Sequence, residues 1–137
     1  MDDCIFCKIV KGKVPSSKVY ESDEILAFLD VGPINKGHTL VIPKKHFETI
    51  LDIPENELKE LILAVKKVAK AVETGVNADG FAVTMSNKKA AGQVVNHTHF
   101  HIIPRYKDDG LKLWPKGADY KEGEMEELRK KIADNIE

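Results

Sequence analysis

The spacing of the apolar residues changes once along the chain, and this change constrains the fold more than any other feature of the sequence. Before Pro54 the apolar residues gather in short runs at 18–20, 25–29 and 39–42, separated by turn residues. Such runs are typical of strands. From Pro54 to Gly75 they recur at three- and four-residue steps, with lysine and glutamate on the other side, as in an amphipathic helix. Strands followed by one long helix predict an α+β domain and not an alternating parallel one.

Further segments complete the predicted fold. Residues 81–85 and 98–103 alternate as half-buried strands do, and the apolar residues of 125–136 are spaced for a short C-terminal helix. The stretch from Lys107 to Gly123 carries three glycines and a proline and is predicted to be a long loop. We therefore expect one domain over residues 1–137, with an antiparallel meander of about five strands, one long helix and a C-terminal helix.

The ends of the long helix carry recognisable signals. Asp52 with Glu55 three positions later is typical of a capping box, and Pro54 suits a first turn. Gly75 provides a C-terminal stop. The apolar stripe of this helix is expected to cover one face of the sheet.

Composition narrows the class of protein. The chain has 137 residues, of which 42% are hydrophobic, as expected for a globular domain. No apolar stretch reaches the roughly 20 residues of a membrane span, and the start of the chain is acidic where a signal peptide would be basic. We therefore expect a cytoplasmic protein without a membrane partner. The net charge is −1 and the lysine pairs are scattered, so a nucleic acid is not the expected partner.

Two features carry candidate chemistry. Cys4 and Cys7 are three positions apart, which in a reducing cytosol favours metal binding or redox work over a disulfide. His97, His99 and His101 alternate, so on a strand they would form a row at intervals of about 6.6–6.8 Å. The row is either three partly exposed histidines without a role, a set of metal ligands, or a nucleophile whose neighbours bind the transferred anion.

The residues before the histidine row favour the last of these uses. Ala90-Ala91-Gly92-Gln93 provides a small, flexible backbone whose N–H groups can hold phosphate oxygens. The lysine-bearing loop of nucleoside triphosphatases, GxxxxGK[ST], is absent from the sequence. This segment predicts a phosphate-handling surface of a different kind.

The chain resembles the histidine-triad (HIT) family. The family signature, HxHxH followed by two hydrophobic residues, is matched at 97–103. Cys4-Ile5-Phe6-Cys7-Lys8-Ile9, Ala27-Phe28-Leu29-Asp30, the segment Gly37 to His46 and Ala91-Gly92-Gln93 resemble family blocks and stand in the family order. The resemblance covers about residues 4–106.

The resemblance implies a mechanism. The middle histidine, His99, is the nucleophile, which attacks an α-phosphate and forms a nucleotidyl-histidine that water then cleaves. Its attacking nitrogen must be unprotonated, and the other ring nitrogen must donate to a fixed acceptor, expected to be a backbone carbonyl. His101 would hold the non-bridging phosphate oxygens, with Gln93 and Asn87 as further donors.

The resemblance also assigns nucleotide and metal sites. Asp30 would accept hydrogen bonds from both ribose hydroxyls, and the base pocket would be lined by Ile5, Phe6, Ile9, Phe28, Leu29 and Val31. The alternative is that these apolar residues are simply core and that Asp30 is only a turn residue. Cys4, Cys7, His46 and His97 would close a structural zinc site, for which a redox pair and idle thiols are the alternatives.

The function that follows is cleavage of purine nucleoside phosphoramidates or related AMP conjugates, by a homodimer. The alternatives are a diadenosine polyphosphate hydrolase, a slow nucleotide-binding regulatory module, and a zinc-dependent interaction domain. Val94 stands where many family members have Ser or Thr, and it cannot donate a hydrogen bond to a leaving group. His38 has no assigned role beyond a structural hydrogen bond.

Overall fold

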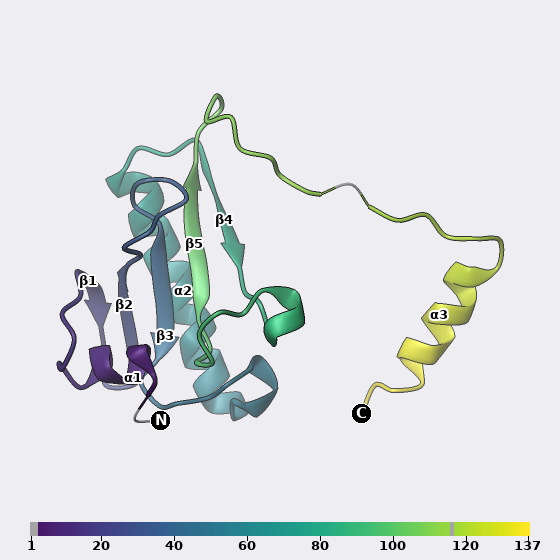
Figure 1. The fold of residues 1–137 in the computed structure, drawn as a ribbon, viewed down its shortest axis with the longest axis horizontal. Coiled ribbons are helices and arrows are strands. Elements are labelled where there is room, and N and C mark those ends of the chain that lie inside the picture. Colours follow the sequence, from purple (N-terminus) through teal and green to yellow (C-terminus); the bar gives the residue numbers. More distant parts are fainter. Residues whose placement is uncertain (1–2, 116) are drawn as a thin grey trace.

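The computed structural model describes residues 3–115 and 117–137 and contains one five-stranded antiparallel sheet, with the order β1-β2-β3-β5-β4 (Figure 1). The strands are β1 (Lys18–Glu21), β2 (Ile25–Leu29), β3 (Thr39–Pro43), β4 (Gly80–Thr84) and β5 (Phe100–Arg105). The helices are α1 (Ile5–Val10), α2 (Glu55–Gly75) and α3 (Glu124–Ala133), with short 3-10 turns at Ile50–Asp52 and Lys89–Ala91. The α+β class, the five antiparallel strands and the long helix are confirmed. Helix α1 was not predicted.

The strand order departs from a simple meander. Strands β1, β2 and β3 follow one another across the sheet, but β5 lies between β3 and β4 and pairs antiparallel with both. Strands β3 and β4 therefore run parallel, which requires a crossover connection, and α2 provides it. The crossover leaves one strand position open, and β5 returns into that position. This arrangement places the histidine segment in the middle of the sheet.

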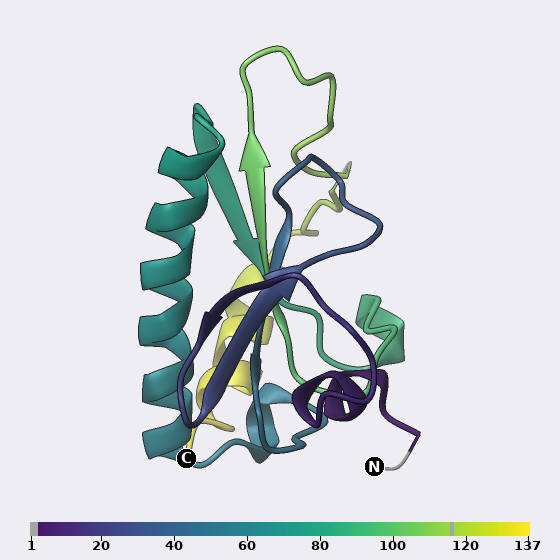
Figure 2. The ribbon, with the colours of Figure 1, turned by 90° about the vertical axis from the view of Figure 1, so that its left-hand side faces the viewer.

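Two apolar layers lie on opposite faces of the sheet, with α2 on one side and α1 on the other (Figure 2). In β2, Ile25 and Ala27 pack toward α2, while Leu26 and Phe28 pack toward α1, as the two-residue period of a strand requires. The α1 side contains the smaller cluster, which consists of Phe6, Ile9, Leu26, Phe28, Leu40 and Ile42. The smaller layer leaves room on this face for a site.

The predicted capping box at the start of α2 is wrong. The carboxylate of Asp52 accepts hydrogen bonds from the backbone N–H of Thr49, at 3.0 Å, and from its hydroxyl, at 3.1 Å. Asp52 therefore closes the preceding 3-10 turn, and α2 starts after Pro54 without a side-chain cap. The predicted stop at Gly75 is confirmed.

The C-terminal part extends away from the sheet. Residues 106–123, apart from the undescribed Lys116, contain no helix or strand and lead to α3, which stands apart from the sheet in Figure 1. The predicted C-terminal helix is confirmed, but its apolar residues Met125, Leu128 and Ile132 are exposed. Within the described parts of the chain, no helix combines the length and apolar character needed to cross a bilayer.

Candidate active site and metal centre

The residues that alternate with the histidines determine which face of the sheet the histidines lie on. Thr98 is fixed to the carbonyl of Phe47 by its backbone N–H, at 2.6 Å, and by its hydroxyl, at 2.9 Å. Phe100 packs into the cluster under α2. His97 and His99, which alternate with these two residues, therefore face the α1 side, where the Phe6 ring lies 5.9 Å from the ring of His97 and 5.1 Å from that of His99. Strand β5 begins only at Phe100, so His97 and His99 precede the strand.

His99 has a defined tautomer. Its Nδ1 lies 2.7 Å from the backbone carbonyl oxygen of His97. A carbonyl only accepts, so Nδ1 of the neutral ring carries the hydrogen and Nε2 holds a free lone pair. A nucleophilic histidine requires this arrangement. The ring is 7% exposed and lines a cavity on the α1 face.

This cavity has a volume of about 390 Å³, which is within the range of small-molecule sites. Its lining includes His99, His101, Asp30 and all six apolar residues predicted for the base pocket: Ile5, Phe6, Ile9, Phe28, Leu29 and Val31. Phe6, Ile9 and Phe28 are also core residues, whereas Val31 is fully exposed. The first three therefore belong to the core and also line the cavity, and their role in holding a base stays a prediction.

The lining also contains Leu40, Gly92 and Val94, which lie in or beside segments named in the sequence, and three residues that the sequence did not single out, namely Pro15, Ser16 and Val95. Pro15 and Ser16 belong to the turn that joins α1 to β1. Their turn-forming residue types were visible in the sequence, but their place beside Asp30 depends on the fold. Gly92 adopts a left-handed backbone with φ +95°, which favours glycine.

Asp30 combines the turn role with a place in the cavity wall. Its Oδ1 accepts a hydrogen bond from the backbone N–H of Gly32 at 2.8 Å, which is a turn contact. Its Oδ2 lies 3.6 Å from Nε2 of His38. One carboxylate oxygen is thus engaged by the turn, while the other faces a histidine.

Gln93 and Asn87 lie outside the residues that line the cavity. The amide of Gln93 donates to the carbonyl of Glu48 at 2.6 Å and accepts from the backbone N–H of Lys88 at 2.7 Å. Asn87 accepts from the backbone N–H of Ile50 at 2.8 Å. In this arrangement both side chains tie the loop before the histidines to the segment before α2, and Gln93 has to give up these bonds before it can contact a phosphate.

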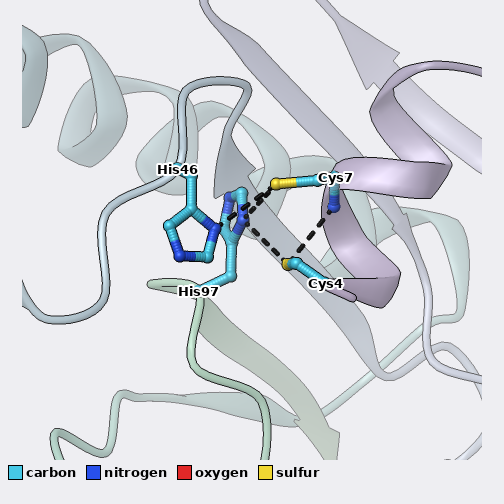
Figure 3. A group of neighbouring side chains, drawn as sticks. All are labelled: Cys4, Cys7, His46 and His97. Atoms are coloured by element: carbon cyan, nitrogen blue, oxygen red, sulfur yellow. Dashed lines mark hydrogen bonds between the residues drawn. The ribbon is translucent and has the colours of Figure 1, made fainter. Parts of the chain in front are cut away.

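The four predicted metal ligands converge (Figure 3). Cys7 Sγ lies 3.3 Å from His46 Nδ1 and 3.5 Å from His97 Nδ1, and Cys4 Sγ lies 3.4 Å from His97 Nδ1. In a tetrahedral zinc site with bonds of 2.3 Å to sulfur and about 2.0–2.1 Å to nitrogen, neighbouring ligand atoms are about 3.5 Å apart. All four ligand atoms lie within 4.8 Å of one another, so the residues can hold a metal ion.

The surroundings of His97 suit a ligand. Its Nε2 donates to the carbonyl of Pro43 at 2.8 Å, which leaves the Nδ1 lone pair directed at the cysteines. Such a bond orients a metal-binding imidazole. Burial lowers the pKa of His97 to about 4, so the ring is neutral near pH 7. The ring of His46 crosses that of His97 with centroids 5.0 Å apart.

His38, for which the sequence predicted only a structural hydrogen bond, lies beside the third histidine of the triad. It is 2% exposed, and its Nε2 lies 2.8 Å from Nδ1 of His101. Burial lowers the pKa of His38, and burial followed by the nearby charge of His99 lowers that of His101 to about 4. The two rings come from segments 63 residues apart in sequence, and no local pattern signals their contact.

The chain is similar in sequence and in structure to several known proteins. The adenosine 5'-monophosphoramidase of Candida albicans is 41% identical over 122 residues, which cover 84% of this chain and 80% of that protein. The crystal structure of a Streptococcus mutans protein matches with a TM-score of 0.92 at 39% identity, covering 100% of this chain and 87% of that one. A zinc-bound histidine triad family protein from Mycobacterium smegmatis matches with a TM-score of 0.77 at 34% identity, covering 97% and 95%.

The family model of the HIT domain matches residues 11–108. This range contains the complete sheet, α2 and all three alternating histidines, whereas residues 1–10 with α1 and residues 109–137 with α3 lie beyond it. With the match covering most of the chain, the protein belongs to the HIT family.

Proposed function

We propose that the protein is a nucleotidyl hydrolase in which Nε2 of His99 attacks the α-phosphorus of a bound nucleotide. The observation that carries the proposal is the 2.7 Å bond from His99 Nδ1 to the His97 carbonyl, in a ring that lines a cavity beside Asp30. This bond fixes the orientation of the imidazole and places the lone pair of its neutral form on Nε2. Membership of the HIT family supports nucleotide hydrolysis in the broad sense.

The reaction proceeds in two displacements. The Nε2 lone pair of His99 forms a bond to phosphorus while the bond to the leaving amine or phosphate breaks, and the departing amine takes a proton from water. Water then attacks the nucleotidyl-histidine and gives its proton back to the solvent, where it replaces the proton taken by the amine. The nitrogen–phosphorus bond breaks, and the nucleoside monophosphate and neutral His99 are released. The His97 carbonyl stabilises the positive charge of the intermediate ring, and His101 holds the phosphate oxygens.

The substrate that we propose is a purine nucleoside phosphoramidate or a related AMP conjugate. Support comes from the related Candida albicans protein, which is named an adenosine 5'-monophosphoramidase. In the proposed complex the base lies among the apolar residues of α1 and β2, and the free oxygen of Asp30 accepts from the ribose. Diadenosine polyphosphates are the competing substrates, and a panel of both classes separates them.

A fluorogenic adenosine phosphoramidate tests the proposal. We expect turnover by the unaltered chain and a loss of at least about 10³-fold in kcat for His99→Ala, because no other group replaces the nucleophile. Lys70→Ala, an exposed substitution on α2, serves as the matched control. Turnover retained in His99→Ala contradicts the mechanism, and nucleotide binding without turnover in the unaltered chain favours a regulatory module.

We further propose that Cys4, Cys7, His46 and His97 hold a structural zinc ion in the cytoplasm, where thiols stay reduced. Two thiolates and two imidazoles form a closed tetrahedral set without an open position for water, so the ion contributes stability and not a reaction step. Metal analysis of chelator-free protein is expected to give one zinc per chain, and Cys4→Ser with Cys7→Ser to remove it. Less than about half an equivalent, unchanged by the substitutions, contradicts the site.

We also propose a homodimer. The support is the exposed apolar surface of the C-terminal part, where Leu113 is 80%, Trp114 86% and Ile132 66% exposed. Exposed apolar groups of this size are typical of surfaces covered by a partner, and the family resemblance makes a second copy that partner. Sedimentation is expected to give about twice 15.3 kDa. A mass near 15.3 kDa at micromolar concentration contradicts the dimer.

A further inference from the structure

The hydrogen bonds of His38 fix the position of its own ring proton. His38 Nδ1 accepts a hydrogen bond from the backbone N–H of Ile34 at 3.1 Å. A backbone amide nitrogen only donates, so Nδ1 must present a lone pair. A neutral imidazole has one N–H, and that of His38 must therefore be on Nε2. Burial lowers the pKa of this ring, which keeps it neutral near pH 7.

The proton of His38 in turn fixes that of His101. His38 Nε2 lies 2.8 Å from His101 Nδ1, and two N–H groups cannot point at each other across this distance. Because His38 Nε2 donates, His101 Nδ1 accepts, and the single proton of neutral His101 lies on Nε2. The backbone N–H of Ile34 does not titrate, and it therefore fixes the donor-to-acceptor direction of these two hydrogen bonds.

The loop that supplies this amide is held in place from several sides. Asn35 donates to the carbonyl of Pro104 at 2.8 Å and to Asp109 at 3.1 Å, and its own carbonyl accepts from the backbone N–H of His38 at 3.0 Å. Gly37 has φ +101°, and a Cβ there would lie 2.9 Å from a methyl of Val76. The loop is therefore tied to the end of β5 and lies close to Val76, the residue that follows α2.

From this chain of bonds we infer that His38 is a positioning residue, which holds His101 in the tautomer that donates from Nε2 to the phosphate under attack. The inference rests on the proposed function. His101 lines the cavity, and its ring lies 5.0 Å from that of His99. Phosphate oxygens only accept hydrogen bonds, so the opposite tautomer would turn a lone pair toward them and lose a donor where negative charge develops.

Asp30 is the charged group that faces this pair, with Oδ2 3.6 Å from His38 Nε2. At this distance its carboxylate favours a proton on Nε2 without replacing His101 as the acceptor. Asp30, which lines the cavity, therefore favours the same tautomer of His38 as the backbone N–H of Ile34 does.

Two substitutions separate positioning from structural support. His38→Gln retains an amide that can accept from Ile34 and donate to His101, whereas His38→Leu can do neither. We expect kcat for the adenosine phosphoramidate to fall about 10²-fold in His38→Leu, as on loss of one oxyanion donor, with KM changing much less. His38→Gln is expected to recover most of the loss. A deficit of the same size in both variants, or none in His38→Leu, overturns the inference.

Nitrogen-15 NMR of the histidine rings gives a readout that does not depend on the variants folding. In the unaltered protein at pH 7.5, His101 is expected to carry its proton on Nε2 and His38 likewise. In His38→Leu the two tautomers of His101 are expected to mix. A proton on His101 Nδ1 in the unaltered protein overturns the inference. His99→Ala distinguishes this failure from that of the proposed function, because turnover retained in that variant contradicts the proposed function whatever the tautomer of His101.

Discussion

At the scale of single residues, the candidate site divides into side chains that local sequence could place and side chains that it could not. The sequence could predict that His97, His99 and His101 lie on one face, because alternate residues of an extended segment point to the same side. The bonds of Gln93 to Glu48 and of His38 to His101 join segments 45 and 63 residues apart. Such contacts depend on the finished fold and have no local signature.

Val94 lines the cavity and is 91% exposed, yet it has no side-chain donor. Val94→Ser introduces a hydroxyl beside the proposed leaving group. One hydrogen bond to that group is worth about 1 kcal/mol, so kcat with an amine leaving group is expected to rise about fivefold. Val94→Ala is the control for the lost methyl groups. Equal kcat values in the serine and alanine variants would show that this position does not reach the leaving group.

The titration of His101 predicts how stability depends on pH. Its pKa is about 4 in the folded chain, mainly through burial, against an ordinary value of 6.5. Between these values the unfolded chain binds the extra proton, so stability rises with pH. The contribution is fully present above pH 6.5 and is lost as the pH falls toward 4. Urea midpoints are expected to drop across this window, less steeply in His101→Gln, and equal slopes contradict this account.

At the scale of the elements, hydrophobic period predicted each strand, α2 and α3 close to their observed bounds. It could not predict α1, because six residues are too few to show a helical period. It also did not give the position of β5, which depends on the parallel crossover through α2. The capping signal failed because Asp52 had a competing donor in Thr49, one turn earlier.

Helix α1 links the proposed metal centre to the proposed nucleotide pocket. Cys4 caps its first turn and Cys7 lies within it, while Ile5, Phe6 and Ile9 line the cavity. Removal of the metal is therefore expected to loosen the base pocket and weaken AMP binding about tenfold, in the range found when support of a metal site is lost. Calorimetry of chelated protein measures this, with zinc-restored protein as the control. An unchanged Kd after verified metal removal would separate the two sites.

At the scale of the whole molecule, the sequence predicted an amphipathic C-terminal helix but not that its apolar side would be exposed. The spacing of Met125, Leu128 and Ile132 indicates an apolar stripe, but it does not indicate which surface covers that stripe. Coverage depends on the length and direction of the arm formed by residues 106–123. This arm leads α3 away from the sheet of its own chain (Figure 1).

Charges placed on this stripe test the proposed dimer. Leu128→Glu with Ile132→Glu is expected to shift sedimentation toward 15.3 kDa, because a charge buried in an apolar contact is costly. The unfolding temperature is then expected to lose its dependence on protein concentration. Lys130→Glu, on the polar side of α3, is the matched control. A dimer of unchanged affinity in the double variant would exclude the stripe from the interface.

The proposed mechanism requires a bond between His99 and phosphorus, and rapid-mixing mass spectrometry tests this most directly. Protein mixed with an adenosine phosphoramidate and quenched in the first turnover is expected to carry one AMP group, which peptide mapping places on His99. The adduct should be absent from His99→Ala. Full turnover without an adduct, or an adduct on another residue, would contradict nucleophilic attack by this histidine.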